Sequence, residues 1–130
     1  MHKECCLGSK FFHMAHTIFE NHVELGFSEE NLRKVKDLKI NIKKSLIRST
    51  AEIDIIAVDI MAKTWEDSPD IAEINKLIDK KFTLKKEAMK ELLNAFLSLK
   101  KMLSKEQLHK LHSICKANTN TEEKENICCG

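Results

Sequence analysis

The sequence predicts an all-α protein built around a long antiparallel helical hairpin with short flanking helices, four helices in total. Glycine and proline together account for four of the 130 residues, which suits long helices and not a sheet with many turns. Apolar residues recur at three- and four-residue steps over most of the chain. A further pattern occurs twice, at 27–31 and 103–107: an apolar residue, a serine, two polar residues and a side-chain amide.

The first predicted helix covers residues 10–25. Its apolar residues fall roughly on one stripe, and Gly26 is a good stop signal because glycine accepts the left-handed backbone of a helix end. Residues 1–9 are polar and include Gly8 and Ser9, so we expect a flexible arm there.

The repeated pattern marks two helix starts. In each copy the serine can cap a helix by accepting a backbone N–H, and the amide stands where a side chain reaches back to the cap. An apolar pair at the spacing of a hydrophobic staple flanks each cap. The caps and amides are Ser28 with Asn31 and Ser104 with Gln107; the apolar pairs are Phe27 with Leu32 and Leu103 with Leu108.

Two long helices are expected between these starts. The second helix runs from residue 28 to about Trp65 and is roughly 50 Å long at ~1.5 Å per residue. The segment EDSPD at 66–70 ends it, and a third helix of similar length follows. The apolar residues of the two helices are Leu32, Val35, Leu38, Ile42, Leu46, Ile53, Ile56 and Ile60, then Ile71, Ile74, Ile78, Phe82, Met89, Leu92, Phe96, Leu99 and Leu103.

Two helices of equal length joined by a short turn form an antiparallel hairpin. The start of the second helix then lies beside the end of the third, so the two capping boxes mark neighbouring corners. The first helix and a fourth, over residues 104–116, both leave from that end. We therefore expect one helical domain over residues 10–117, followed by a disordered tail at 118–130.

The composition excludes several classes of function. A net charge of +2 does not argue for binding nucleic acid, and no apolar stretch approaches the ~20 residues of a membrane helix, so we expect no membrane insertion. No Gly-rich phosphate loop, nucleophile elbow or ExxH pair is present, so we expect no enzyme. Because no secretory signal is visible, the predicted location is cytoplasmic, or periplasmic if an export signal has been removed.

The candidate metal ligands crowd both ends of the sequence. No histidine or cysteine occurs between His22 and His109. The five cysteines are odd in number, which favours reduced thiols or metal ligation over a disulfide-stapled fold. The histidines and cysteines near the N-terminus are His2, Cys5, Cys6, His13, His16 and His22, and those near the C-terminus are His109, His112, Cys115, Cys128 and Cys129.

Two histidine pairs have helical spacing. His13 and His16 are about one turn apart, as are His109 and His112. Imidazole pairs suit Zn, Cu, Ni or Co, and a thiolate favours Zn or Cu(I), so Zn is the first expectation. The predicted ligand set is completed by Cys115, Cys5 and Cys6. The alternatives are a solvated His109, a core Cys115, and oxidation-prone surface thiols in the adjacent cysteine pairs.

The charge pattern and one apolar run predict an antiparallel homodimer. Residues 33–48 are basic and the turn end is acidic, so a basic half of one copy could face an acidic half of another. The alternative is a solvated helix face. The stretch 53–60 is apolar on more than one face, which is more than a two-helix hairpin can cover.

The two boxes and the hairpin pattern of residues 49–111 resemble the Spy/CpxP family, whose signature is the LTxxQ motif, and in particular its periplasmic heavy-metal sensor branch. The match spans residues 11–111; Ser replaces Thr in both boxes, and Phe27 and Asn31 depart from the motif. The resemblance implies a bacterial stress-response protein that is a hooked hairpin and an antiparallel homodimer.

The resemblance also implies a function, which is either metal sensing or chaperoning and involves no catalysis. His13, His16, His109 and His112 match the metal-site positions. The first expectation is a metal-binding sensor or sequestration protein with a signalling partner. The alternatives are an ATP-independent holdase chaperone with unfolded clients, and a helical adaptor without a ligand.

Overall fold

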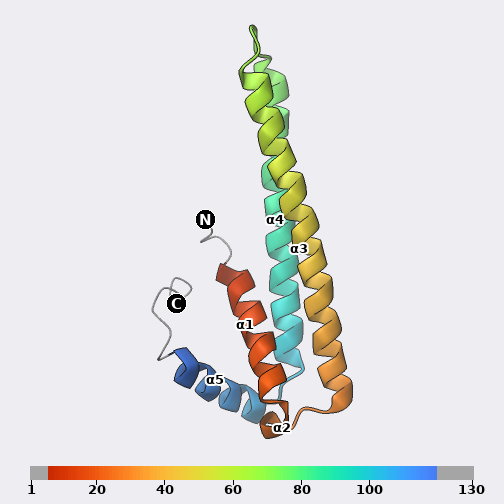
Figure 1. The fold of residues 1–130 in the computed structure, drawn as a ribbon, viewed down its shortest axis with the longest axis vertical. Helices are drawn as coiled ribbons and strands as arrows, with labels where there is room; N and C mark the ends of the chain where they lie inside the picture. Colours follow the sequence, from red (N-terminus) through yellow and green to blue (C-terminus); the bar gives the residue numbers. More distant parts are fainter. Residues whose placement is uncertain (1–5, 120–130) are drawn as a thin grey trace. The chain divides into compact units, whose positions relative to one another are not determined.

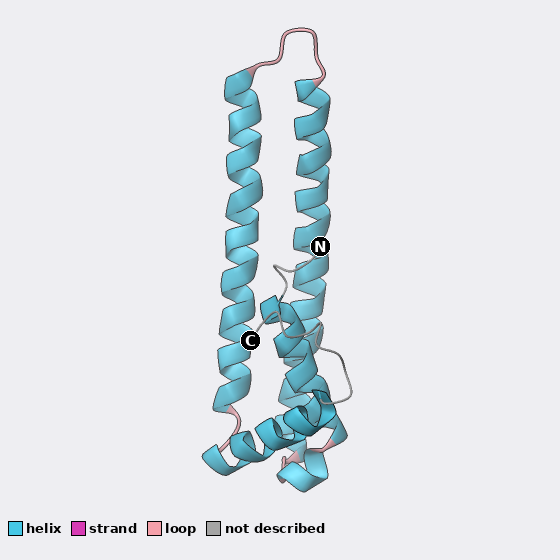
Figure 2. Cartoon of the chain, turned by 90° about the vertical axis from the view of Figure 1, so that its left-hand side faces the viewer, coloured by secondary structure: helices cyan, strands magenta, loops and turns pink. Residues whose placement is uncertain are grey.

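The computed structural model describes residues 6–119, with the side chains of residues 7–117, and every regular element in that part is a helix (Figure 2). The elements are α1 (Cys6–Glu20), α2 (His22–Leu25), α3 (Glu29–Thr64), α4 (Ile71–Lys101) and α5 (Lys105–Thr119), labelled in Figure 1. The predicted all-α class is confirmed, with two long helices packed against each other. Five helices are present in place of four because the first predicted helix is divided into α1 and α2.

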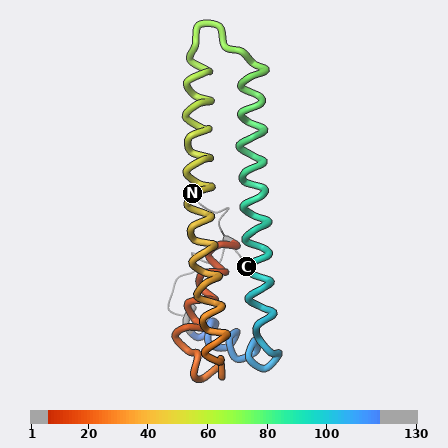
Figure 3. Tube along the Cα trace, turned by 90° about the vertical axis from the view of Figure 1, so that its right-hand side faces the viewer, coloured from red at the N-terminus to blue at the C-terminus, as the bar shows by residue number. Residues whose placement is uncertain are grey.

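The chain forms two compact units. Unit 2, residues 42–91, consists of the second part of α3, the connection at 65–70 and the first part of α4. Its two helices run antiparallel, side by side (Figure 3). The Ser45 hydroxyl donates to Glu91 Oε1 at 2.7 Å near one end, and Lys63 Nζ lies 3.4 Å from Glu73 Oε1 near the other. These two contacts join α3 to α4 near both ends of the unit and confirm the hairpin.

The connection between the long helices ends with a cap. Asp70 Oδ1 accepts the backbone N–H of Glu73 at 3.3 Å, so the carboxylate satisfies one of the free donors at the start of α4. Pro69 precedes this cap, where a missing N–H costs no helical hydrogen bond. The EDSPD segment therefore ends one helix and starts the next, as its composition predicts.

Unit 1 contains α1, α2 and α5 with the first part of α3 and the last part of α4. It holds eleven of the thirteen buried apolar side chains among the described residues. Gly8 is buried, and a Cβ placed there would lie 3.6 Å from Leu92 Cδ1. This packing extends α1 back to Cys6, four residues before the expected start at Lys10, so residues 6–9 are helical. The remainder of the predicted arm, and residues 120–130 of the predicted tail, lie outside the described residues.

The break between α1 and α2 is accompanied by local side-chain hydrogen bonds. The Asn21 side chain donates to the Thr17 carbonyl at 2.9 Å, and a His22 ring nitrogen lies 2.9 Å from the Phe19 carbonyl. Such bonds compete with the helical pattern of the backbone. The last turn then stops at Gly26, whose φ of 72° is the left-handed conformation that a glycine accepts without strain.

Among the described residues, no helix combines the length and the apolar character needed to cross a membrane.

Candidate functional site

Helices α1 and α5 contact each other in unit 1, and their fully buried side chains include Phe11, Ile18 and Leu111. Gln107, near the start of α5, bonds to Leu25, whereas Cys115, further along α5, contacts Thr17, which precedes Leu25. The two helices therefore run in opposite senses. As predicted, the N-terminal and C-terminal flanking segments come together.

The second capping box starts α5 and also makes a hydrogen bond to another helix. Ser104 N–H donates to Gln107 Oε1 at 2.9 Å and Gln107 N–H donates to Ser104 Oγ at 3.1 Å, which is the complete reciprocal box. The remaining amide donor of Gln107, Nε2, bonds to the Leu25 carbonyl at 2.8 Å. One side chain thus caps α5 and fastens it to the end of α2. Sequence reasoning found the cap and missed the second bond.

The first box is half complete. Asn31 N–H donates to Ser28 Oγ at 3.1 Å, and no reciprocal bond from the Asn31 side chain is present among the described contacts. The difference follows from residue type, because Asn is one methylene shorter than the Gln or Glu that this position of the box requires.

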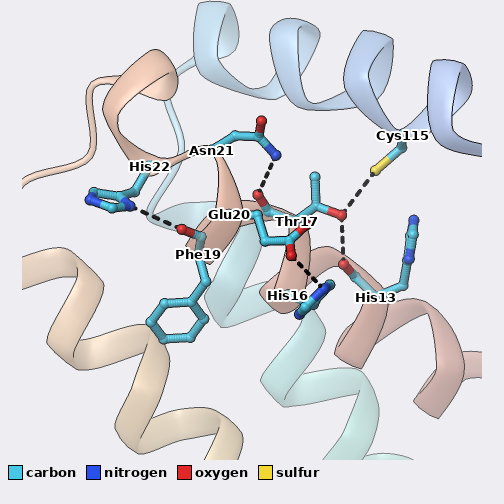
Figure 4. Close-up of polar contacts among 8 residues, drawn as sticks. All are labelled: His13, His16, Thr17, Phe19, Glu20, Asn21, His22 and Cys115. Carbon is cyan, nitrogen blue, oxygen red and sulfur yellow. Dashed lines mark hydrogen bonds and ion pairs between the residues drawn. The ribbon is translucent and has the colours of Figure 1, made fainter.

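The two histidines of α1 have different surroundings (Figure 4). The His13 ring extends toward the helix that carries Cys115, and the His13 carbonyl accepts the Thr17 hydroxyl at 2.8 Å. His16 extends to the other side of α1, where its Nε2 lies 3.2 Å from Glu20 Oε2. Both side chains are exposed. His13 is therefore the histidine of the predicted pair that neighbours a residue of α5.

On α5, His109 and His112 are also exposed. Leu111 is the fully buried residue of this helix, and Leu108 and Cys115 are half-buried. At ~100° per residue, His109 projects roughly opposite to Leu111, away from the packed face. Among the predicted ligands of α5, Cys115 is the one that faces α1.

Cys115 is half-buried, and its Sγ donates to Thr17 Oγ1 at 3.9 Å. Burial raises the pKa of the Cys115 thiol, and the hydrogen bond with Thr17 opposes that shift only in part. A thiol with a raised pKa provides less thiolate at neutral pH, which makes it a poorer nucleophile and a poorer metal ligand.

The remaining predicted ligands are not placed by the structure. Cys5 lies outside the described residues, and of Cys6 only the backbone, the first residue of α1, is described. In the part of the chain that is described, no three His, Cys, Asp or Glu side chains are grouped as a metal site. Metal binding by the predicted set remains a prediction.

Unit 2 has a second candidate surface, on the outer side of α3. Two apolar side chains of this unit are buried, Ile42 and Ile56, and nine large ones are exposed. We call four exposed residues of α3 and the adjoining Trp65, each between 58% and 79% exposed, the outer stripe of α3: Ile47, Ile55, Val58, Met61 and Trp65. At ~100° per residue most of them project from the side of α3 opposite to the buried positions. This half of α3 is therefore apolar on two faces.

A third surface lies on α4. Ile78, Phe82 and Met89 recur at steps of four and seven residues and are exposed, and we call them the α4 stripe. Lys81 Nζ and Lys85 Nζ lie 5.8 and 5.6 Å from the centre of the Phe82 ring. Both distances suit an attraction between a cation and an aromatic face. The stripe is thus apolar and bordered by positive charge.

The charges of unit 2 are separated along its length. Residues 57–79, at the turn end, contain six acidic and two basic side chains, a net charge of −4. Residues 42–56 and 80–91, at the other end, contain eight basic and four acidic side chains, a net charge of +4. Unit 2 as a whole is neutral. Because its two ends carry opposite charges, each end attracts the opposite end of a similar body.

No family model, curated protein or solved structure matches this chain. The resemblance to the Spy/CpxP family therefore stays a prediction from the sequence, and the function must be argued from the surfaces described above.

Proposed function

We propose that the protein is a non-catalytic interaction protein whose hairpin pairs with a second copy of itself and presents apolar surface to other proteins. The observation that carries this proposal is the excess of exposed over buried apolar side chains in unit 2, where nine large ones are exposed and two are buried. Apolar side chains scattered singly on a surface need no explanation, but a continuous stripe is typical of an interface. Fully burying one such side chain contributes about 1.5–3 kcal/mol.

The charge separation favours a second copy as the partner of the outer stripe of α3. In an antiparallel pair, the end of one hairpin with a charge of −4 lies beside the end of the other with a charge of +4. A parallel pair would place like charges together. Because exposed charges are screened over about 8 Å at physiological salt, the charges mainly set the orientation, and the apolar stripe supplies the affinity.

The test is a matched pair of substitutions. Val58→Asp places a carboxylate in the middle of the outer stripe, and Val23→Asp makes the same change at an 82% exposed position of α2. We expect a dimer for the parent and for Val23→Asp in sedimentation equilibrium, and a monomer for Val58→Asp, because a charge buried in an apolar seam lacks a partner. Both positions are exposed, so each change alters the monomer's unfolding free energy by about 0.5 kcal/mol or less.

Two results would refute self-association through this stripe. One is a monomeric parent at about 0.1 mM, a concentration that detects even weak dimers. The other is equal association of Val58→Asp and Val23→Asp. Raising the salt concentration should weaken the parent dimer without abolishing it, since the apolar contribution persists.

A second activity, holding unfolded chains in the manner of an ATP-independent holdase, is favoured by the α4 stripe. An exposed Phe82 between two lysines offers apolar contact together with attraction for acidic segments, the mixture that unfolded proteins present. This surface is on a different helix from the outer stripe of α3, so both could act in one molecule.

The holdase activity is measured by light scattering while a heat-sensitive protein such as citrate synthase unfolds. We expect the parent to suppress the scattering, and Phe82→Asp to suppress it less. The control is Thr83→Asp, which adds the same charge at the adjacent exposed position but off the α4 stripe. If the two variants protect equally well, the α4 stripe is not the client surface.

A further inference from the structure

The outer stripe of α3 contains a sulfur atom that lies at the surface and accepts a hydrogen bond. The indole Nε1 of Trp65 donates to Met61 Sδ at 3.2 Å across one helical turn. Met61 is 58% exposed and Trp65 is 79% exposed, whereas Met14 is 7% exposed in the core of unit 1. Dissolved oxidants therefore reach the Met61 thioether, and the donor that contacts it is the one tryptophan of the sequence.

An exposed thioether is a site for oxidation by peroxides. A lone pair of Met61 Sδ attacks one oxygen of hydrogen peroxide, the O–O bond breaks and an S–O bond forms. The hydroxide that leaves takes the proton from the transferred oxygen, so the products are methionine sulfoxide and water. The sulfur loses two electrons and the peroxide gains them. We propose that peroxide oxidation of Met61 switches off self-association through the outer stripe of α3.

The switch acts on the self-association proposed above and rests on it, because oxidation makes one residue of the stripe polar. A thioether sulfur is a weak hydrogen-bond acceptor and packs as an apolar group, whereas a sulfoxide is polar. The sulfoxide oxygen can accept the Trp65 N–H, which keeps the polar group within the stripe. Covering that group in an apolar seam removes it from water at a cost in free energy. Each copy of a symmetric pair carries one such group, so we expect association to weaken by at least about tenfold.

Association should in turn protect Met61 from peroxide. A second hairpin seated on the outer stripe covers Met61, so the oxidant reacts with the separate hairpin. Met89 is 53% exposed on the α4 stripe, which is on a different helix, and it serves as an internal reference. We expect the rate of oxidation of Met61 relative to Met89 to be lower at about 0.1 mM protein than at about 1 μM, because association is favoured at the higher concentration. Equal relative rates would show that the seam does not cover Met61.

Trypsin places these methionines in separate peptides. Cleavage after lysine and arginine gives 11–33 with Met14, 49–63 with Met61 and 87–90 with Met89. The full-length protein is treated with hydrogen peroxide, and dithiothreitol then reduces any sulfenic acid or disulfide of its cysteines and leaves the methionine sulfoxide in place. We expect mass spectrometry to find one added oxygen in 49–63 and in 87–90, and little in 11–33. A peptide 49–63 that stays unmodified while 87–90 is oxidised overturns the assignment of Met61.

The single tryptophan reports on Met61 whether or not two copies associate. Its N–H exchanges a thioether acceptor for a sulfoxide oxygen, so we expect oxidation to change the Trp65 emission in dilute protein. Met61→Leu keeps an apolar side chain of similar volume and lacks the sulfur, so its emission should not respond to peroxide. Emission that stays unchanged while 49–63 is oxidised counts against the contact on which the proposal is built.

Sedimentation equilibrium before and after peroxide measures the switch. We expect the association constant to fall at least about tenfold in the parent and in Met89→Leu, and to change less than about twofold in Met61→Leu, whatever its starting value. Methionine sulfoxide reductases should restore the parent's association. An equal loss in the parent and in Met61→Leu, or an oxidised parent that associates as before, overturns the switch. A parent that is monomeric before oxidation refutes the self-association itself, so the two failures are distinguished.

Discussion

At the scale of single residues, Gln107 both caps the start of α5 and makes a tertiary hydrogen bond to Leu25. We predict that Gln107→Glu lowers the free energy of unfolding by about 1–2 kcal/mol, because the carboxylate can still accept the Ser104 N–H but cannot donate to the Leu25 carbonyl. Glutamate is as good a capping-box residue as glutamine, so the change removes the tertiary bond and keeps the cap. Urea denaturation followed by circular dichroism measures the difference.

The matched control is Asn31→Asp, the same exchange of amide for acid in the first box. The Asn31 side chain makes no described bond to another helix, so this change should shift the unfolding free energy by about 0.5 kcal/mol or less. Equal losses for the two variants would show that the bond from Gln107 to Leu25 contributes nothing to stability.

Single residues also explain where sequence reasoning failed locally. The stripe over residues 10–25 predicts one helix, but the helix is divided at Asn21, where the His22 ring competes for the Phe19 carbonyl. Periodicity cannot reveal such competition, although an Asn beside a His is a hint of it. The polar residues 1–9, with Gly8 and Ser9 among them, predict a flexible arm, yet Gly8 is buried in α1 beside Leu92. That contact lies 84 positions away in the sequence.

At the scale of one helix, we expect two adjacent residues of α3 to affect different properties: one the stability of the hairpin and the other the association of two copies. Ile56 is 3% exposed and packs inside the hairpin, whereas Ile55 is 61% exposed on the outer stripe. We predict that Ile56→Ala lowers the unfolding free energy by about 2 kcal/mol or more, since it removes one of two buried apolar side chains of unit 2. Ile55→Ala should leave the stability of the monomer nearly unchanged and weaken the dimer.

The measurement combines thermal unfolding at low protein concentration with sedimentation at high concentration. If Ile55→Ala destabilises the dilute monomer as much as Ile56→Ala does, the two faces of α3 are not distinct. If Ile56→Ala weakens association and leaves unfolding unchanged, the buried face belongs to the dimer and not to the hairpin.

Helix α4 shows why periodicity predicted the hairpin but not its contact face. The sequence analysis placed Ile74, Ile78 and Phe82 on one apolar stripe. In the structure the less exposed positions run through Ile74, Leu77 and Lys81, and Ile78 and Phe82 belong to the exposed α4 stripe. Two apolar stripes of equal period share one helix, and only packing against α3 decides which is covered.

At the scale of the whole molecule, the sequence predicted the helical class, the hairpin and the meeting of its flanking segments. These features follow from local signals for the start and end of a helix: two capping boxes, one turn segment and Gly26. The arrangement of the candidate ligands depends on how α1 and α5 rotate about their own axes, and no local pattern encodes that rotation. The structure accordingly brings His13 near Cys115, and leaves His109 on the exposed side of α5.

Metal binding is the prediction that involves both flanking helices at once. We expect Zn²⁺ added to the fully reduced protein to raise its Tm, because a metal held jointly by α1 and α5 binds only the folded state. The effect should weaken as the pH falls, since a protonated imidazole or thiol cannot bind a metal.

Two double variants test which histidines bind the metal, His13→Ala with His16→Ala and His109→Ala with His112→Ala. If all four histidines bind the metal, each double variant loses the increase in Tm. If only the first does, the ligands on α5 are reduced to Cys115, the residue that faces α1. An unchanged Tm for the parent, together with no retained zinc after dialysis, would leave protein binding by the hairpin as the function of the molecule.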